Sequence, residues 1–151
     1  MSRTAAHPHD RAVLLGGIDA VPNLPAEVDA VVSLCRLGSA EAPAAGLRPA
    51  DHVEVWLTDS ADPGRNPHLD LVLAQAADTV AALRAEGRTV LIHCVEAKSR
   101  TPAVAALYAA RHLGLPVRQA LADVRAVLPT AQPNAAFLDA LDRLGLPTSI
   151  S

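Results

Sequence analysis

The sequence predicts an α/β fold with a small, largely parallel sheet of about four to five strands, flanked by helices on both faces. Two observations predict it. Short runs of apolar and β-branched residues, typical of buried strands, lie at 11–15, 29–35, 51–57 and 89–92. Longer stretches with apolar residues every three or four positions, typical of amphipathic helices, lie at 67–86, 102–115, 116–128 and 134–144.

The length of the chain, 151 residues, suits one domain with one core. We expect a flexible N-terminal segment at 1–10, a single domain at 11–146 and a short tail at 147–151. Half of the residues are hydrophobic, and the aromatic residues are Trp56, Tyr108 and Phe137. The core must therefore be mainly aliphatic.

Charge and cysteine content limit the classes of function. The formal net charge is −3, the isoelectric point is about 6.0, and no basic cluster is present. This argues against nucleic acid or an acidic membrane surface as the main partner. No apolar run approaches the ~20 residues of a membrane span, and the polar N-terminus does not resemble a signal peptide. Two cysteines make no disulfide framework. If Cys94 is a thiolate nucleophile, the compartment should be reducing, and we expect the cytoplasm. The richness in Ala, Arg and Pro is typical of GC-rich bacterial genes, and the oligomeric state stays open.

The first predicted strand, 11–15, is closed by Gly16 and Gly17. Before it, His7 and His9 have no cluster of cysteines or carboxylates around them. We therefore expect a solvated segment there rather than a metal site.

The strand at 29–35 is apolar enough to be central, and the one at 51–57 alternates polar and apolar residues. Cys35 lies inside the first of them. It is either a small core residue or a resolving partner that could form a disulfide with Cys94.

The helices have recognisable ends. Asn66 is a fitting N-cap for the helix at 67–86, Pro67 a fitting first residue, and Gly87 a fitting stop. Asn134 is the predicted cap of the last helix.

The stretch 93–101 lies between a predicted strand and a predicted helix. Cys94 ends the strand at 89–92, a loop of five residues follows, and Arg100 opens the helix. Successive loop N–H groups and a helix N-terminus together form an anion cradle. A cysteine in such a cradle should be held as thiolate, the nucleophilic form. The guanidinium of an arginine matches two phosphate oxygens, so the pattern predicts phosphate chemistry.

The run His93-Cys94, five residues, Arg100-Thr101 resembles the signature of the cysteine-dependent protein tyrosine phosphatases, and the chain as a whole is most similar to their compact dual-specificity branch. A second match follows about 35 residues later. There Val124-Arg125 and Leu128-Pro129 precede Pro133-Asn134-Ala135-Ala136-Phe137, similar to the late segment of that family. The resemblance implies a dual-specificity-phosphatase-like α/β fold and a hydrolase that needs no metal and no cofactor.

The resemblance also implies roles for single residues. Cys94 would attack phosphorus and form a phosphocysteine, while Arg100 would bind the phosphate oxygens. The amides of the loop would do the same, and its residues are Val95, Glu96, Ala97, Lys98, Ser99 and Arg100. Thr101 could hydrogen-bond the thiolate, or cap the following helix. His93 either fixes the loop and tunes Cys94 or is a core histidine.

A leaving group needs a proton, hence a positioned carboxylic acid. The family takes it from an aspartate in the loop that here follows Leu57, and Asp59 is the first choice. Asp62 is the rival, although it precedes Pro63-Gly64 and could simply make a turn. Glu96 is expected to point outward at the rim of the pocket.

Two departures from the family pattern bear on activity. Ala97 stands where many members have glycine, which would cost roughly 1 kcal/mol if that residue needs a positive φ. Glu96 places a negative charge beside an anion site, partly offset by Lys98.

Three functions therefore compete. The first is a phosphomonoester phosphatase acting on a phosphorylated protein or a small phosphomonoester, between which the sequence does not decide. The second is a phosphate-binding pseudo-phosphatase module with weak catalysis. The third is a sulfur-transfer or arsenate-reducing enzyme, which the spacing to Arg100 and the candidate acid Asp59 disfavour.

Overall fold

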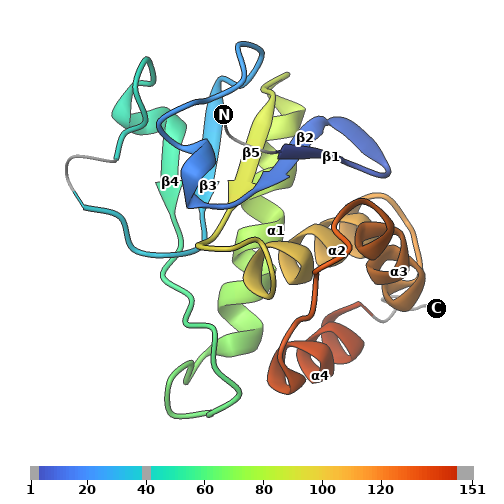
Figure 1. Cartoon of the computed structure of the whole chain (residues 1–151). Coiled ribbons are helices and arrows are strands. Elements are labelled where there is room, and N and C mark those ends of the chain that lie inside the picture. The colour runs from blue at the N-terminus through green and yellow to red at the C-terminus, as the bar shows by residue number, and fades with distance from the viewer. Residues whose placement is uncertain (1–3, 39–41, 146–151) are drawn as a thin grey trace.

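A computed structural model describes residues 4–38 and 42–145 of the chain. Five strands form one sheet in the order β1-β2-β5-β3-β4, and only the β1–β2 pair is antiparallel. The strands span Thr4–His7 (β1), Asp10–Gly16 (β2), Ala30–Ser33 (β3), His52–Glu54 (β4) and Val90–His93 (β5). The predicted α/β class and largely parallel sheet are thus confirmed (Figure 1).

The central strands are buried because both faces of the sheet are covered. Alternate residues of β5 belong to different apolar clusters: Val90 and Ile92 face one, Leu91 the other. The larger cluster takes residues from all four α-helices, at Leu69–Ala85 (α1), Arg100–His112 (α2), Val117–Val127 (α3) and Ala135–Leu144 (α4). The smaller cluster is covered by the 3₁₀ helix Ile18–Ala20 (η1) and by irregular segments. None of the described helices is long and apolar enough to cross a membrane.

Helix ends follow the predicted signals in part. Gly87 has φ +80°, the left-handed conformation that closes α1. Asn134 accepts a hydrogen bond from Phe137 N–H at 3.0 Å and so caps α4, as predicted. Asn66, by contrast, does not cap α1, which begins at Leu69. Its amide pairs with the backbone of Thr58 instead, accepting from N–H at 3.0 Å and donating to C=O at 2.7 Å.

The N-terminal segment differs from the expectation of a flexible start. Residues 4–7 form the edge strand β1, and His7 is buried, donating from Nε2 to Ala105 C=O at 2.9 Å. Residues 1–3 and the predicted tail at 147–151 lie outside the described residues. Strand β4 is also shorter than predicted, because the 3₁₀ helix Pro49–Asp51 (η2) occupies the start of that stretch.

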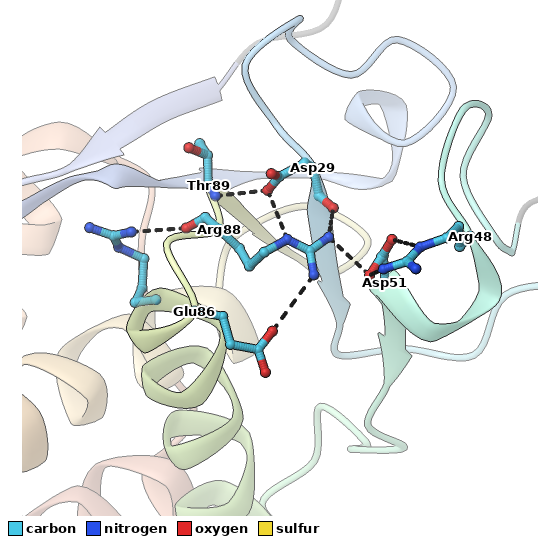
Figure 2. Close-up of polar contacts among 7 residues, drawn as sticks. Asp29, Arg48, Asp51, Glu86, Arg88 and Thr89 are labelled. Carbon is cyan, nitrogen blue, oxygen red and sulfur yellow. Dashed lines mark hydrogen bonds and ion pairs between the residues drawn. The ribbon is translucent and has the colours of Figure 1, made fainter.

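An ion-pair network links the segments just before β3 and β5 (Figure 2). It lies at the amino ends of these strands, whereas the cysteine loop follows the carboxyl end of β5. Arg88 contacts the Asp51 carboxylate at 2.9 Å and the Asp29 carboxylate at 3.4 Å. Asp51 is also bound by Arg48 at 2.9 Å, and Asp29 accepts the backbone N–H of Thr89 at 2.8 Å. Burial works against ionisation of Asp51, but the bond from Arg48, helped by Arg88, holds its pKa below the usual value.

Candidate active site

The connection from β5 to α2 lies at the carboxyl edge of the sheet (Figure 1) and holds the predicted cysteine and arginine. Cys94 follows the last residue of β5, and Arg100 is the first residue of α2. They line a small pocket of about 60 Å³. Its lining residues are Asp59, Cys94, Val95, Glu96, Lys98, Ser99 and Arg100. Most of the residues that the sequence singles out are therefore brought together, with His93 and Thr101 buried beside them.

The loop holds its carbonyl groups outward. Three of them accept hydrogen bonds from other parts of the chain: Cys94 C=O from His93 Nδ1 (3.2 Å), Val95 C=O from Ile18 N–H (3.0 Å) and Lys98 C=O from Gln132 N–H (2.6 Å). In a trans peptide the N–H of the next residue points away from the carbonyl. The N–H groups of Val95, Glu96 and Ser99 are therefore turned to the inner side, which makes a concavity for an anion.

Two backbone features allow this loop shape. A Cβ atom at Gly17 would lie 2.8 Å from Val95 C=O, so only glycine lets η1 approach the loop this closely. Ala97 has a positive φ of +61°. This is the conformation that glycine, present at this position in many members of the family that the chain resembles, adopts without strain. An alanine in this conformation costs about 1 kcal/mol, and this strain lies inside the loop itself.

Cys94 is nearly inaccessible, at 2% exposure. Thr101 donates a hydrogen bond from Oγ1 to its sulfur at 3.0 Å. Since α2 begins at Arg100, Thr101 belongs to the first turn and is not the cap of the helix. The sulfur is therefore supported by a hydroxyl donor, in addition to the helix N-terminus.

The Arg100 guanidinium is held by the ends of two neighbouring strands. Its Nη1 donates to Leu34 C=O at 3.3 Å and to Leu57 C=O at 3.0 Å. Its Nε is the one buried side-chain nitrogen or oxygen of the described chain without a hydrogen-bond partner. A buried donor left unpaired in a native fold needs an explanation, and an anion in the pocket provides one.

The two candidate acids have different surroundings. Asp59 lines the pocket, is exposed, and accepts a hydrogen bond from Asn134 Nδ2 at 2.9 Å. Asp62 makes a turn, in which its carboxylate accepts Gly64 N–H at 2.9 Å and its carbonyl accepts Arg65 N–H at 3.0 Å.

The remaining predicted residues are placed as follows. Glu96 and Lys98 are exposed at the rim of the pocket. Ser99 is buried and accepts Asn134 N–H at 3.0 Å, which joins the loop to the start of α4. Cys35 and Cys94 are both buried, and no disulfide joins them. In the described ranges no three side chains of His, Cys, Asp or Glu are grouped so that they could hold a metal ion.

The sequence interpretation missed several residues around the site. Gly17 and Ile18 support the loop from η1, and Gln132 supports it from the segment before α4. Ser33 contacts His93 from β3, and His52 contacts Ser33 from β4. The sequence offers only a weak indication of Ser33 and His52, namely that each is a polar residue within a predicted strand.

The chain is similar to known dual specificity phosphatases. Dual specificity protein phosphatase 1 of Arabidopsis thaliana is 29% identical over 113 residues, which cover 72% of this chain and 55% of that protein. Human dual specificity phosphatase 28 is 36% identical over 81 residues, which cover 52% of this chain and 46% of that protein. The chain thus spans about half the length of the curated relatives it matches. No protein-family model matches it.

Comparison with solved structures gives the same fold. A single-residue variant of human dual specificity phosphatase 28 matches with a TM-score of 0.80 at 22% identity, over 96% of this chain and 95% of its own. In sequence, the chain is similar to dual specificity phosphatases of the cysteine-dependent protein tyrosine phosphatase superfamily, and it shares the fold of their solved structures.

Proposed function

We propose that this protein is a phosphomonoester hydrolase that acts through a phosphocysteine on Cys94. The observation that carries the proposal is the pairing, in one small pocket, of a buried cysteine with an arginine whose buried Nε lacks a partner. A phosphoryl group in contact with the sulfur would supply acceptor oxygens to that Nε and to the inward N–H groups of the loop.

In the first step, the Cys94 thiolate attacks phosphorus and the bond from phosphorus to the leaving oxygen breaks. Asp59 in its acid form gives its proton to that oxygen. Arg100 and the loop amides bind the equatorial oxygens, whose charge needs fixed donors in the transition state.

In the second step, water attacks phosphorus, Asp59 takes a proton from it, and the bond from phosphorus to sulfur breaks. Inorganic phosphate and the thiolate result. The Thr101 hydroxyl, 3.0 Å from the sulfur, would stabilise the departing thiolate.

Phosphorylated molecules are the general substrate class of the phosphatases that this chain resembles. We propose a phosphorylated protein or a small phosphomonoester. We also propose a reducing compartment such as the cytoplasm, because a nucleophilic Cys94 must stay reduced.

A weaker activity is the second candidate, and one observation favours it. The strained Ala97 lies within the loop that would bind phosphate. A loop that relaxes away from this conformation would still attract an anion but would align the sulfur poorly for attack. This pseudo-phosphatase would bind phosphate or vanadate without turnover.

Hydrolysis of para-nitrophenyl phosphate in the presence of EDTA, from about pH 4.5 to about pH 8, tests the proposal. Wild type, Cys94→Ser and Asp59→Asn are compared with Asp62→Asn, a matched change in the same loop. We expect no turnover by Cys94→Ser, a loss of up to about 100-fold in Asp59→Asn, and activity within about 2-fold of wild type in Asp62→Asn.

Each outcome decides something. Full activity of Cys94→Ser would exclude the phosphocysteine. A loss confined to Asp62→Asn would transfer the acid role to Asp62. A folded wild-type protein that binds vanadate without turnover would establish the pseudo-phosphatase.

A further inference from the structure

A continuous chain of hydrogen bonds runs beneath the cysteine loop through three buried side chains. His52 Nδ1 lies 2.9 Å from Ala44 N, and His52 Nε2 lies 2.7 Å from Ser33 Oγ. Ser33 Oγ lies 2.5 Å from His93 Nε2, and His93 Nδ1 lies 3.2 Å from Cys94 C=O. Ser33 and His93 are fully buried and His52 is 9% exposed. The chain crosses three adjacent strands, β4, β3 and β5.

The two ends of the chain fix the direction of every hydrogen bond in it. A backbone N–H can only donate, so His52 Nδ1 accepts from Ala44 and carries no proton. His52 then has its proton on Nε2 and donates it to Ser33 Oγ. Burial lowers the pKa of His52, against the opposing charge of Glu54, which agrees with a neutral ring. The Ser33 hydroxyl is left to donate to His93 Nε2.

His93 consequently carries its proton on Nδ1, where it donates to the carbonyl of Cys94. The opposite arrangement fails at the carbonyl of Cys94. A neutral His93 with its proton on Nε2 would have no proton on Nδ1, which would then face the carbonyl oxygen of Cys94. That conflict would leave an acceptor facing an acceptor in a buried site, at considerable cost.

The proton on His93 Nδ1 bears directly on the phosphate loop. It holds the carbonyl of the peptide between Cys94 and Val95, and so turns the N–H of Val95 to the inner side of the loop. We propose that Ser33 and His52 are positioning residues that set the Nδ1–H tautomer of His93 and thereby orient the first peptide of the phosphate loop. The functional part of this inference rests on the proposed function.

This inference gives a role to the segment around Ala44, which lies far from the cysteine in sequence. Its backbone N–H is the fixed donor at one end of the chain, as the carbonyl of Cys94 is the fixed acceptor at the other end. It also explains two buried polar residues, Ser33 and His52, which the proposed chemistry does not use. The role of His93 is then to orient a peptide as a neutral ring.

Nitrogen NMR of histidine-labelled wild-type protein at neutral pH tests the tautomers without any need for activity. We expect the Nε2–H form for His52 and the Nδ1–H form for His93, assigned by comparison with single histidine variants. Finding His93 in the Nε2–H form, or doubly protonated, would overturn the inference even in a fully active enzyme.

Two variants of His52 then separate the orientation of His93 from simple packing. In His52→Gln the side-chain amide can still donate to Ser33 Oγ, whereas His52→Leu fills the space but removes the donor. We expect His52→Gln to keep the Nδ1–H signal of His93. His52→Leu should lose it, weaken vanadate binding about 10-fold and lower kcat for para-nitrophenyl phosphate about 10-fold.

The readouts also separate this inference from the proposed function. If the wild-type protein shows no phosphatase activity, the histidine tautomers and the affinity for vanadate still test the positioning role of Ser33 and His52. Equal vanadate binding by both variants, or an unchanged His93 signal in His52→Leu, would contradict it. If His52→Leu fails to fold, as circular dichroism would reveal, the wild-type tautomers and Ser33→Ala decide, since Ser33→Ala must also release the His93 tautomer.

Discussion

Asn134 donates a hydrogen bond from its side-chain amide to the carboxylate of Asp59 at 2.9 Å, across 75 residues of sequence. The same residue makes two further contacts. Its backbone N–H donates to Ser99 Oγ at 3.0 Å, and its side-chain oxygen caps α4 by accepting from Phe137 N–H at 3.0 Å. One residue thus joins the candidate acid and the cysteine loop to the start of α4. Because the amide binds Oδ1, the other oxygen of Asp59 is the one that would carry the proton in the proposed reaction.

Asn134→Asp should separate the contact with Asp59 from the helix cap. Aspartate is as good an N-cap as asparagine, so the free energy of unfolding should change by less than about 0.5 kcal/mol. The donor to Asp59 is lost and a like charge replaces it. We expect kcat to fall about 10-fold for phenyl phosphate, whose leaving group needs a proton, and much less for para-nitrophenyl phosphate.

Asn134→Ala is the control, since it loses the cap as well and should cost about 1 kcal/mol of stability. Urea unfolding and steady-state kinetics measure both effects. An unchanged ratio of the two substrates in Asn134→Asp would show that Asn134 does not position Asp59.

The Thr101 hydroxyl offers a test of the second half of the proposed reaction. Thr101→Val keeps the shape of the buried side chain but removes the hydrogen bond to the Cys94 sulfur, 3.0 Å away. A hydrogen bond to a charged group contributes about 1.5–3 kcal/mol, so breakdown of the phosphocysteine should slow about 10- to 100-fold.

Rapid-mixing kinetics would then show a burst of nitrophenol followed by a slow steady state. Thr101→Ser retains the hydroxyl and should resemble wild type. A uniform loss in both variants, without a burst, would point to packing at this position instead.

Much of the candidate site was predictable because several of its residues are close together in the sequence. Cys94, Arg100 and Thr101 lie within eight positions of one another, between a strand and a helix that the apolar pattern predicts well. The α/β class followed from the same alternation. Asp59 was chosen through the family resemblance, which implies an acid in the loop after Leu57, and the structure places it at the pocket.

The parts that were not predicted depend on contacts between distant segments. Asn66 is of a residue type that often caps helices, but its side-chain amide pairs with the backbone of Thr58 instead. His7 lies in a polar stretch typical of a loose terminus, yet β1 pairs with β2 and buries it against α2. The support of the loop by Ile18 and Gln132 comes from backbone groups, which carry no residue-specific signal.

Ala97 provides a test of strain in the loop. Its φ of +61° costs an alanine about 1 kcal/mol, while glycine adopts this conformation freely. Ala97→Gly should stabilise the fold by up to about 0.6 kcal/mol, because the greater freedom of glycine in the unfolded chain offsets about 0.4 kcal/mol or more of the gain. That corresponds to a rise in Tm of up to about 2 °C, measurable by calorimetry.

The same variant distinguishes the two candidate functions. If strain in the loop weakens catalysis, kcat should rise in Ala97→Gly along with stability. Ala97→Val, whose branched side chain tolerates a positive φ poorly, should have the opposite effect on both. A loss of stability in Ala97→Gly would mean that the buried methyl group contributes more than the strain costs.

His7 predicts how stability depends on pH. Its Nε2 donates to Ala105 C=O at 2.9 Å and its Nδ1 accepts His9 N–H at 3.0 Å, so both nitrogens are occupied by a neutral ring. Burial lowers the pKa of His7, and the nearby His9 adds to this, while the bond to Ala105 and the charge of Asp10 oppose it.

The sign of the effect follows from which state binds the proton. The unfolded chain takes up a proton at His7 near the ordinary pKa of about 6.5, whereas the folded chain does so only at lower pH. The contribution of neutral His7 to the free energy of unfolding is therefore fully present above about pH 6.5. It declines below that pH, by at most about 1.4 kcal/mol per pH unit. His52, whose pKa burial also lowers, adds a slope of the same sign.

His7→Gln keeps a side-chain donor for Ala105 and has nothing to titrate. Urea unfolding between about pH 7.5 and about pH 5.5 should give a shallower loss of stability in this variant than in wild type. The double variant with His52→Gln should be shallower still. If the free energy of unfolding of His7→Gln depends on pH as steeply as that of wild type, the acid sensitivity of the fold arises elsewhere. His7 would then bind its proton equally well in the folded and unfolded chain.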